Sequence, residues 1–228
     1  MAAAAAQALK AQKRALRKTI STALSKLSPE AVSEQSHAIA TRVLALPAVQ
    51  RAGTVSCYMS MPSGEARTLR IAEGVLASAG RRLFVPKIGA GEGAMEFFRV
   101  YTVQDMQEMA PGLWGIPEPG ETWGVEERER VLASPKEILD VILVPGVAFD
   151  RSLARLGHGK GHYDRFITAY VASGRPKPLL VGLALSAQLL PAGQVPVGAH
   201  DWKMDVLITP EETLGVGADG EVAAAPAL

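Results

Sequence analysis

The stretch DVILVPGVAFDRSLARLGHGKGHYDRFITAYVASG, residues 140–174, predicts the fold of this chain. It begins with an apolar run, residues 140–146, that lacks strict alternation, as is typical of a parallel strand covered on both faces. A short turn and a glycine-rich loop follow, and apolar residues then recur at helical spacing, as at Phe166, Ile167 and Tyr170. The order strand, loop, helix indicates one unit of an α/β sheet.

The same rhythm extends through the rest of the chain, where apolar β-rich runs alternate with helical patterns. The further runs are TVSCYMS (54–60), RRLFVPK (81–87), EFFRVY (96–101), PLLVGLALS (178–186) and DVLITP (205–210). We therefore expect an α/β fold with a mainly parallel sheet, helices on both faces and a Rossmann-like three-layer architecture. Helices expected over residues 7–27 and 30–46 would cover one face of the sheet.

Length and composition indicate one domain. The chain has 228 residues, 48% of them hydrophobic, which is enough to bury a core without covalent cross-links. We expect this domain to span residues 1–213, followed by a disordered tail over the small, Gly-punctuated residues 214–228. Cys57 is the only cysteine, so an intrachain disulfide and a Cys-based zinc site are excluded, which favours a reducing, cytoplasmic location.

The charge balance limits the classes of partner. A formal net charge of +1 provides no general attraction to nucleic acid or to an anionic membrane surface, and no apolar run approaches the length of a membrane span. We expect a monomer that binds small molecules. Residues 1–29 contain six basic residues and no acidic one, a pattern of either a docked helix with basic flanks or an organellar transit peptide that would create a mitochondrial pool.

The glycine loop RLGHGKGHYD (155–164) predicts a phosphate site, because dense glycine lets backbone approach a ligand closely and Lys160 adds positive charge. It follows a buried strand and precedes a helix, so backbone N–H groups and the positive end of the helix dipole would meet the ligand. Gly161 after the lysine excludes a P-loop, and the spacing of the glycines excludes the dinucleotide fingerprint. The alternative is a Gly-rich turn whose lysine lies in solvent.

Five motifs together resemble the 5-formyltetrahydrofolate cyclo-ligase family, also called methenyltetrahydrofolate synthetases. LVPGVAFDRSLARLGHGKGHYDRFI resembles the family signature PGxxFDxxGxRLGxGKGYYD. The other motifs, in family order, are KRALRK (13–18), YMSMPSGEART (58–68), GLWGIPEP (112–119) and VPVGAHDWKMDVLITP (195–210). The resemblance covers residues 13–210 and is highly specific.

The resemblance implies cyclisation of 5-formyltetrahydrofolate to 5,10-methenyltetrahydrofolate, with ATP as co-substrate, Mg²⁺ as cofactor, and ADP and phosphate as products. ATP would phosphorylate the formyl oxygen, N10 would attack the activated carbon, and phosphate would leave, which requires positioning and charge neutralisation. The implied catalytic residues are Lys160, Arg155 and Lys13. The implied ATP-binding residues are Lys13, Arg14, Arg17, Arg155, Leu156, Gly157, His158, Gly159, Lys160, Gly161, His162 and Tyr163.

Carried over by position, Asp164 and Asp205 are the expected Mg²⁺ ligands. Their structural alternatives are a first-turn acid favoured by the helix dipole and a residue that opens a strand. Glu65 matches a folate-contacting acid, with a solvated acid before a helix as its alternative, and Trp114 is expected to wall the substrate unless it only anchors a core. The implied substrate-binding residues are Met59, Glu65, Trp114, His158, Gly159, Lys160, Gly161 and His162.

Two positions depart from the family pattern. His162 stands where most members have tyrosine, and His158 stands where arginine is common, so affinity or its pH dependence can differ. Cys57, within an apolar strand, is interpreted as a buried small hydrophobe. Two other functions remain open: a small-molecule kinase or a sugar-phosphate- or CoA-handling protein of related architecture, and a protein that sequesters formylfolate without turnover.

Overall fold

The computed structural model describes residues 2–89, 91, 94–112, 115–134 and 136–215. A seven-stranded sheet runs through its centre in the order β14-β13-β11-β8-β1-β2-β3. Five neighbouring strands of this sheet are parallel, and the antiparallel β3 and β14 close its two edges. Its strands are β1 (Thr54–Ser56), β2 (Arg82–Ile88), β3 (Met95–Val100), β8 (Val141–Val144), β11 (Leu179–Leu183), β13 (Val206–Ile208) and β14 (Thr213–Gly215).

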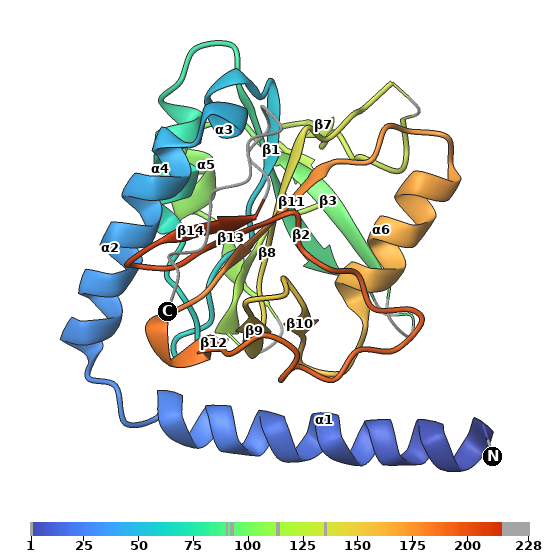
Figure 1. The fold of residues 1–228 in the computed structure, drawn as a ribbon. Coiled ribbons are helices and arrows are strands. Elements are labelled where there is room, and N and C mark those ends of the chain that lie inside the picture. The colour runs from blue at the N-terminus through green and yellow to red at the C-terminus, as the bar shows by residue number, and fades with distance from the viewer. Residues whose placement is uncertain (1, 90, 92–93, 113–114, 135, 216–228) are drawn as a thin grey trace.

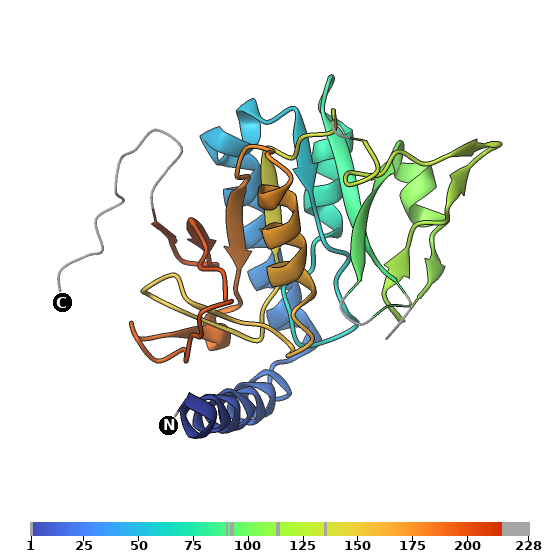
Figure 2. The same cartoon turned by 90° about the vertical axis from the view of Figure 1, so that its right-hand side faces the viewer.

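Helices cover both faces of the sheet, as the sequence predicted (Figures 1 and 2). On one face, α2 (Pro29–Ala45) packs against α4 (Leu69–Leu76) and β13. On the other, α6 (His162–Ala172) packs against β3. The Rossmann-like three-layer expectation is confirmed.

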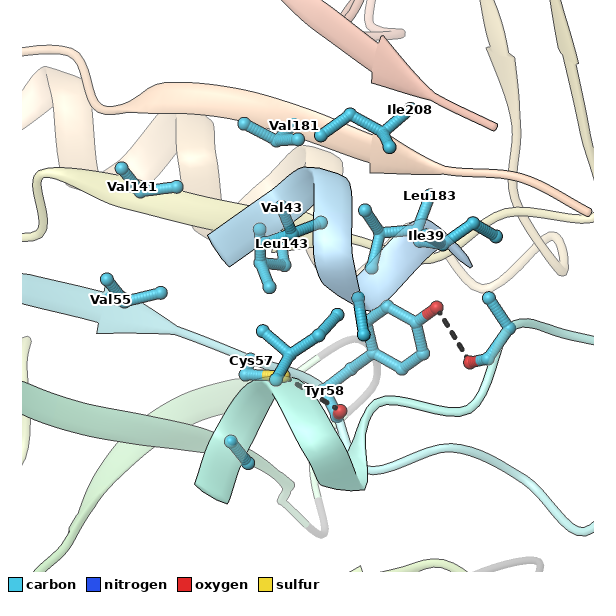
Figure 3. Close-up of a cluster of buried hydrophobic side chains, with 14 of the residues drawn as sticks. Ile39, Val43, Val55, Cys57, Tyr58, Val141, Leu143, Val181, Leu183 and Ile208 are labelled. Atoms are coloured by element: carbon cyan, nitrogen blue, oxygen red, sulfur yellow. Dashed lines mark hydrogen bonds between the residues drawn. The ribbon is translucent and has the colours of Figure 1, made fainter. Parts of the chain in front are cut away.

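Two hydrophobic clusters, one for each face, follow from the alternation of side chains along the strands. Val141 and Leu143 of β8 enter the cluster beneath α2, whereas Ile142 of the same strand enters the cluster beneath α6. Figure 3 shows Ile39 and Val43 of α2 among the side chains of the first cluster, which also includes Cys57. Cys57 is fully buried, and burial raises the pKa of its thiol to about 12, which confirms the hydrophobic role predicted for it.

The long first helix does not lie where the sequence analysis put it. Helix α1 (Ala2–Leu24) was expected to cover a sheet face with α2, but it crosses the edge of the sheet at the carboxyl ends of the parallel strands (Figures 1 and 2). Its apolar side, including Ile20 and Leu24, joins the first cluster from that edge, and it contacts the 3-10 helix η2 (Ser186–Gln188). Its basic residues can therefore reach a site at the strand ends.

Short elements complete the described chain. They are α3 (Pro47–Arg51), α5 (Val103–Gln107), β4 (Ala110–Pro111), β5 (Pro117–Glu118), β6 (Thr122–Trp123), β7 (Glu126–Glu127), β9 (Ala148–Asp150), β10 (Arg155–Leu156) and β12 (Leu189–Leu190). Strand β14 continues through Gly215 with Leu214 buried, so the domain extends two residues beyond the predicted boundary at 213. The rest of the predicted tail, residues 216–228, lies outside the described residues.

Candidate functional site

A cavity of about 490 Å³ lies at the carboxyl ends of the parallel strands, between the glycine loop, α1 and the first part of the sheet. Helix α1 contributes Lys10, Lys13 and Arg17 to its wall. This is the edge at which open α/β sheets bind ligands, because loops that leave neighbouring strands converge there. The rest of the wall is polar on one side and apolar on the other.

The polar side is formed by the glycine loop. Residues 155–164 all line the cavity, which brings together the loop residues predicted for nucleotide binding. Gly159 and Gly161 have φ angles of 100° and 68°, in the region that side chains disfavour, and Gly161 is the residue before the first turn of α6. The loop and the N-terminus of α6 thus lie together at the cavity, an arrangement that suits anion binding.

Helix α1 docks on this loop at close range. The Arg17 Nε donates a hydrogen bond to the Gly157 carbonyl at 2.8 Å, and a Cβ added at Gly159 would lie 3.3 Å from the Arg17 guanidinium. The Lys13 ammonium pairs with the Asp201 carboxylate. The predicted docked helix is therefore observed, and two of its three predicted basic residues, Lys13 and Arg17, line the cavity.

The neighbouring loop residues differ in their partners. Arg155 is buried, and its guanidinium donates to the Asp164 carboxylate at 2.7 Å and to the Pro145 carbonyl at 3.2 Å. Lys160 is exposed to the cavity, and none of the described residues forms an ion pair with it. Arg155 therefore fixes the loop to α6, whereas Lys160 is the lysine available to an anionic ligand.

Asp150 fixes the segment that leads into the glycine loop, a role that the sequence analysis missed. Its fully buried carboxylate accepts hydrogen bonds from the backbone N–H groups of Ser152 at 2.8 Å, Ala154 at 3.3 Å and Val195 at 3.0 Å. Burial alone would raise the pKa of Asp150, but the hydrogen bonds from Ser152, Val195 and Ala154 hold it below its ordinary value. Asp150 thus joins the segment before the glycine loop to the segment before Asp201.

The two predicted metal ligands are not brought together. Asp164 lines the cavity, and its carboxylate accepts from Arg155 and from the Trp202 backbone N–H at 3.0 Å. Asp205 precedes β13 at the opposite, amino-terminal edge of the sheet, where it pairs with Lys177 at 2.6 Å and accepts from the Leu180 backbone N–H at 2.9 Å. The alternative interpretation of Asp205, a residue that opens a strand, describes its place in the structure.

Asp201, not Asp205, is the second aspartate that lies at the cavity with Asp164. It lines the cavity, and it directly precedes Trp202, whose backbone N–H binds Asp164. Besides pairing with Lys13, it accepts from the Gly198 backbone N–H at 2.5 Å. Among the described residues no three His, Cys, Asp or Glu side chains gather as a metal site, so a cation here would take two carboxylates and complete its shell from a ligand and water.

The apolar side of the cavity surrounds Glu65. Met59, Met61, Pro86, Ile88, Met95 and Ile116 line this part, so the predicted Met59 and Glu65 are both present. Glu65 is 4% exposed and accepts a hydrogen bond from the Met61 backbone N–H at 2.7 Å. Burial raises the pKa of its carboxyl to about 7, although this hydrogen bond opposes the rise. The alternative of a solvated acid is therefore wrong.

The remaining predicted residues behave differently from one another. His158 and His162 both line the cavity, and burial, with the charges of Arg17 and Arg155, lowers the pKa of His158, which keeps its imidazole neutral at pH 7. Arg14 is exposed on α1 and is not among the residues that line the cavity, because it follows Lys13 by about 100° around the helix. Trp114 lies outside the described residues.

Three comparisons with known proteins agree. Residues 9–210 match the model of the 5-formyltetrahydrofolate cyclo-ligase family. A Schizosaccharomyces pombe protein named probable 5-formyltetrahydrofolate cyclo-ligase is 35% identical over 89% of this chain and 97% of its own length. The Saccharomyces cerevisiae 5-formyltetrahydrofolate cyclo-ligase is 33% identical over 87% of this chain and 95% of its own. The Aquifex aeolicus 5,10-methenyltetrahydrofolate synthetase structure is 32% identical, with a TM-score of 0.70 over 94% of this chain and 97% of that one.

Proposed function

Because this chain belongs to the 5-formyltetrahydrofolate cyclo-ligase family, we propose that it converts 5-formyltetrahydrofolate to 5,10-methenyltetrahydrofolate with hydrolysis of ATP to ADP and phosphate. One observation carries the proposal: a single cavity has a basic, glycine-rich wall on one side and a buried acid among apolar side chains on the other. The first side suits a triphosphate, and the second suits a flat heterocycle with polar edges.

The polar side can position the phosphates. Lys160 and the backbone N–H groups of the loop would contact the γ-phosphate, and Lys13 and Arg17 would add positive charge from α1. The formamide oxygen of the substrate is a poor leaving group, so its phosphorylation makes it displaceable. N10 then attacks the formyl carbon, the N10 proton is lost, and the bond from carbon to the phosphorylated oxygen breaks as the five-membered ring closes.

Asp164 and Asp201 would hold Mg²⁺, with Asp201 in place of the predicted Asp205. Both carboxylates line the cavity beside the phosphate loop, and carboxylate oxygens are the donors that Mg²⁺ prefers. When bound, Mg²⁺ would neutralise charge on the ATP phosphates. Each carboxylate is paired with a basic residue in the structure, Asp164 with Arg155 and Asp201 with Lys13.

Glu65 would bind the pterin. A carboxylate can accept paired hydrogen bonds from the N3–H and 2-amino groups of a 2-amino-4-oxopteridine, and the surrounding apolar side chains would cover the ring. None of the described helices is long and apolar enough to cross a membrane. The cytoplasmic location and the monomeric state stay predictions.

The test is to mix the purified protein with 5-formyltetrahydrofolate and Mg²⁺, with and without ATP, and to follow methenyl absorbance and phosphate release together. We expect ATP-dependent growth of the absorbance with one phosphate per product. Tight folate binding without product would instead identify a sequestering protein, and ATP hydrolysis without a folate requirement would identify a kinase-like enzyme.

A further inference from the structure

Two of the buried polar atoms that lack a hydrogen-bond partner, among the described residues, lie in the first turn of α6. These are the Tyr163 hydroxyl and the His162 Nδ1. Both side chains line the cavity. A buried hydroxyl without a partner is costly to the fold, so such a group at a binding site indicates a missing ligand contact.

The Tyr163 ring is held firmly in place. It makes an edge contact with Phe97 of β3 at 6.2 Å between centroids, and the Arg155 guanidinium lies 6.0 Å from its centroid. The contact with Phe97 places the Tyr163 side chain against β3, the strand whose Met95 lines the apolar side of the cavity together with Glu65. Burial, with the charge of Glu65 acting in the same direction, raises the pKa of the hydroxyl well above its ordinary value, so the hydroxyl is a protonated donor.

A ligand that binds both the Glu65 carboxylate and the Tyr163 hydroxyl must present a hydrogen-bond donor to Glu65 and, beside it, an acceptor to Tyr163. The 2-amino-4-oxopteridine edge has this order: the 2-amino and N3–H donors stand next to the O4 carbonyl. We propose that the Tyr163 hydroxyl donates a hydrogen bond to the O4 carbonyl of the pterin while Glu65 accepts from the neighbouring N–H groups. This inference rests on the proposed function and moves Tyr163 from the nucleotide to the pterin, as a specificity-determining residue.

The test compares Tyr163→Phe with the wild-type protein by calorimetry, using 5-formyltetrahydrofolate, tetrahydropterin and ATP as separate ligands. Tetrahydropterin keeps the ring and lacks the p-aminobenzoyl-glutamate tail. We expect the variant to weaken both pterin ligands by the same factor, about 3- to 10-fold as for one lost hydrogen bond, and to leave ATP affinity unchanged. A weaker ATP affinity with unchanged folate affinity, or a loss confined to the ligand with the tail, would overturn the proposal.

Tyr170→Phe is the matched control. Tyr170 lies on the same helix, but its hydroxyl accepts from the Leu139 backbone N–H at 2.8 Å in the second cluster, away from the cavity. Its loss should lower stability without changing the affinity for either pterin ligand. If the wild-type protein forms no methenyl product and binds neither pterin ligand, the proposed function fails; if it does both and Tyr163→Phe behaves like it, only the assignment of Tyr163 fails.

Discussion

Replacement of Glu65 by glutamine should change how the stability of this protein depends on pH. The buried Glu65 carboxyl has a pKa of about 7 in the fold against an ordinary value of 4.5, so the folded state binds more protons than the unfolded state between these pH values. The stability contributed by the neutral carboxyl is therefore complete below pH 4.5 and is lost as the pH rises through about 7.

The size of the effect follows from the same two values. Each pKa unit corresponds to about 1.4 kcal/mol, and between pH 5 and pH 8 the free energy of unfolding should fall by about 2.5 kcal/mol because of this one group. Glutamine cannot ionise, and its amide oxygen can still accept the hydrogen bond from the Met61 backbone N–H. Glu65→Gln should thus exceed the wild-type protein in stability by about 1 kcal/mol at pH 5 and by about 3.4 kcal/mol at pH 8.

The assay is denaturant unfolding of both proteins, without ligands, across pH 5 to 8, with Glu126→Gln as an exposed control that should leave the pH profile unchanged. The same Glu65→Gln protein should lose affinity for 5-formyltetrahydrofolate, because the amide cannot accept two hydrogen bonds from the pterin edge. Parallel pH profiles for the Glu65→Gln and wild-type proteins would refute the reasoning, since they would show that the carboxyl does not ionise at a higher pH in the fold.

Three further predictions concern the loop and its surroundings. Lys160→Ala should lower kcat/KM by about 100-fold with unchanged circular dichroism, because the lysine lines the cavity and no residue in the described part of the chain forms an ion pair with it; activity like that of an exposed Lys203→Ala control would contradict its role. Asp201→Asn should raise the Mg²⁺ concentration needed for half-maximal activity, whereas Asp205→Asn should not, which a magnesium titration of both decides. Asp150→Ala should cost about 2–4 kcal/mol in urea unfolding, because three backbone N–H groups lose a buried acceptor, and a loss under 1 kcal/mol would count against that role.

The sequence by itself determined the elements and the layers. Each apolar run predicted for the main sheet overlaps an observed strand, and the glycine loop lines the cavity through residues 155–164. These features are local: the period of the apolar residues distinguishes a strand from a helix, and a lysine between closely spaced glycines predicts an anion site. The motifs around Lys13 and Glu65 could also be recognised in the sequence, because all residues of each motif lie within one short segment.

Only the tertiary structure decided which side chains meet. Asp201 and Asp205 stand four residues apart in one motif, but Asp201 lines the cavity whereas Asp205 directly precedes β13 at the far edge of the sheet. The apolar spacing of α1 predicts a helix but not the surface on which it docks, because a sheet face and a sheet edge both bury an apolar stripe. The pKa of Glu65 and the burial of the Tyr163 hydroxyl likewise depend on neighbours distant in sequence, since burial is a property of the packed fold.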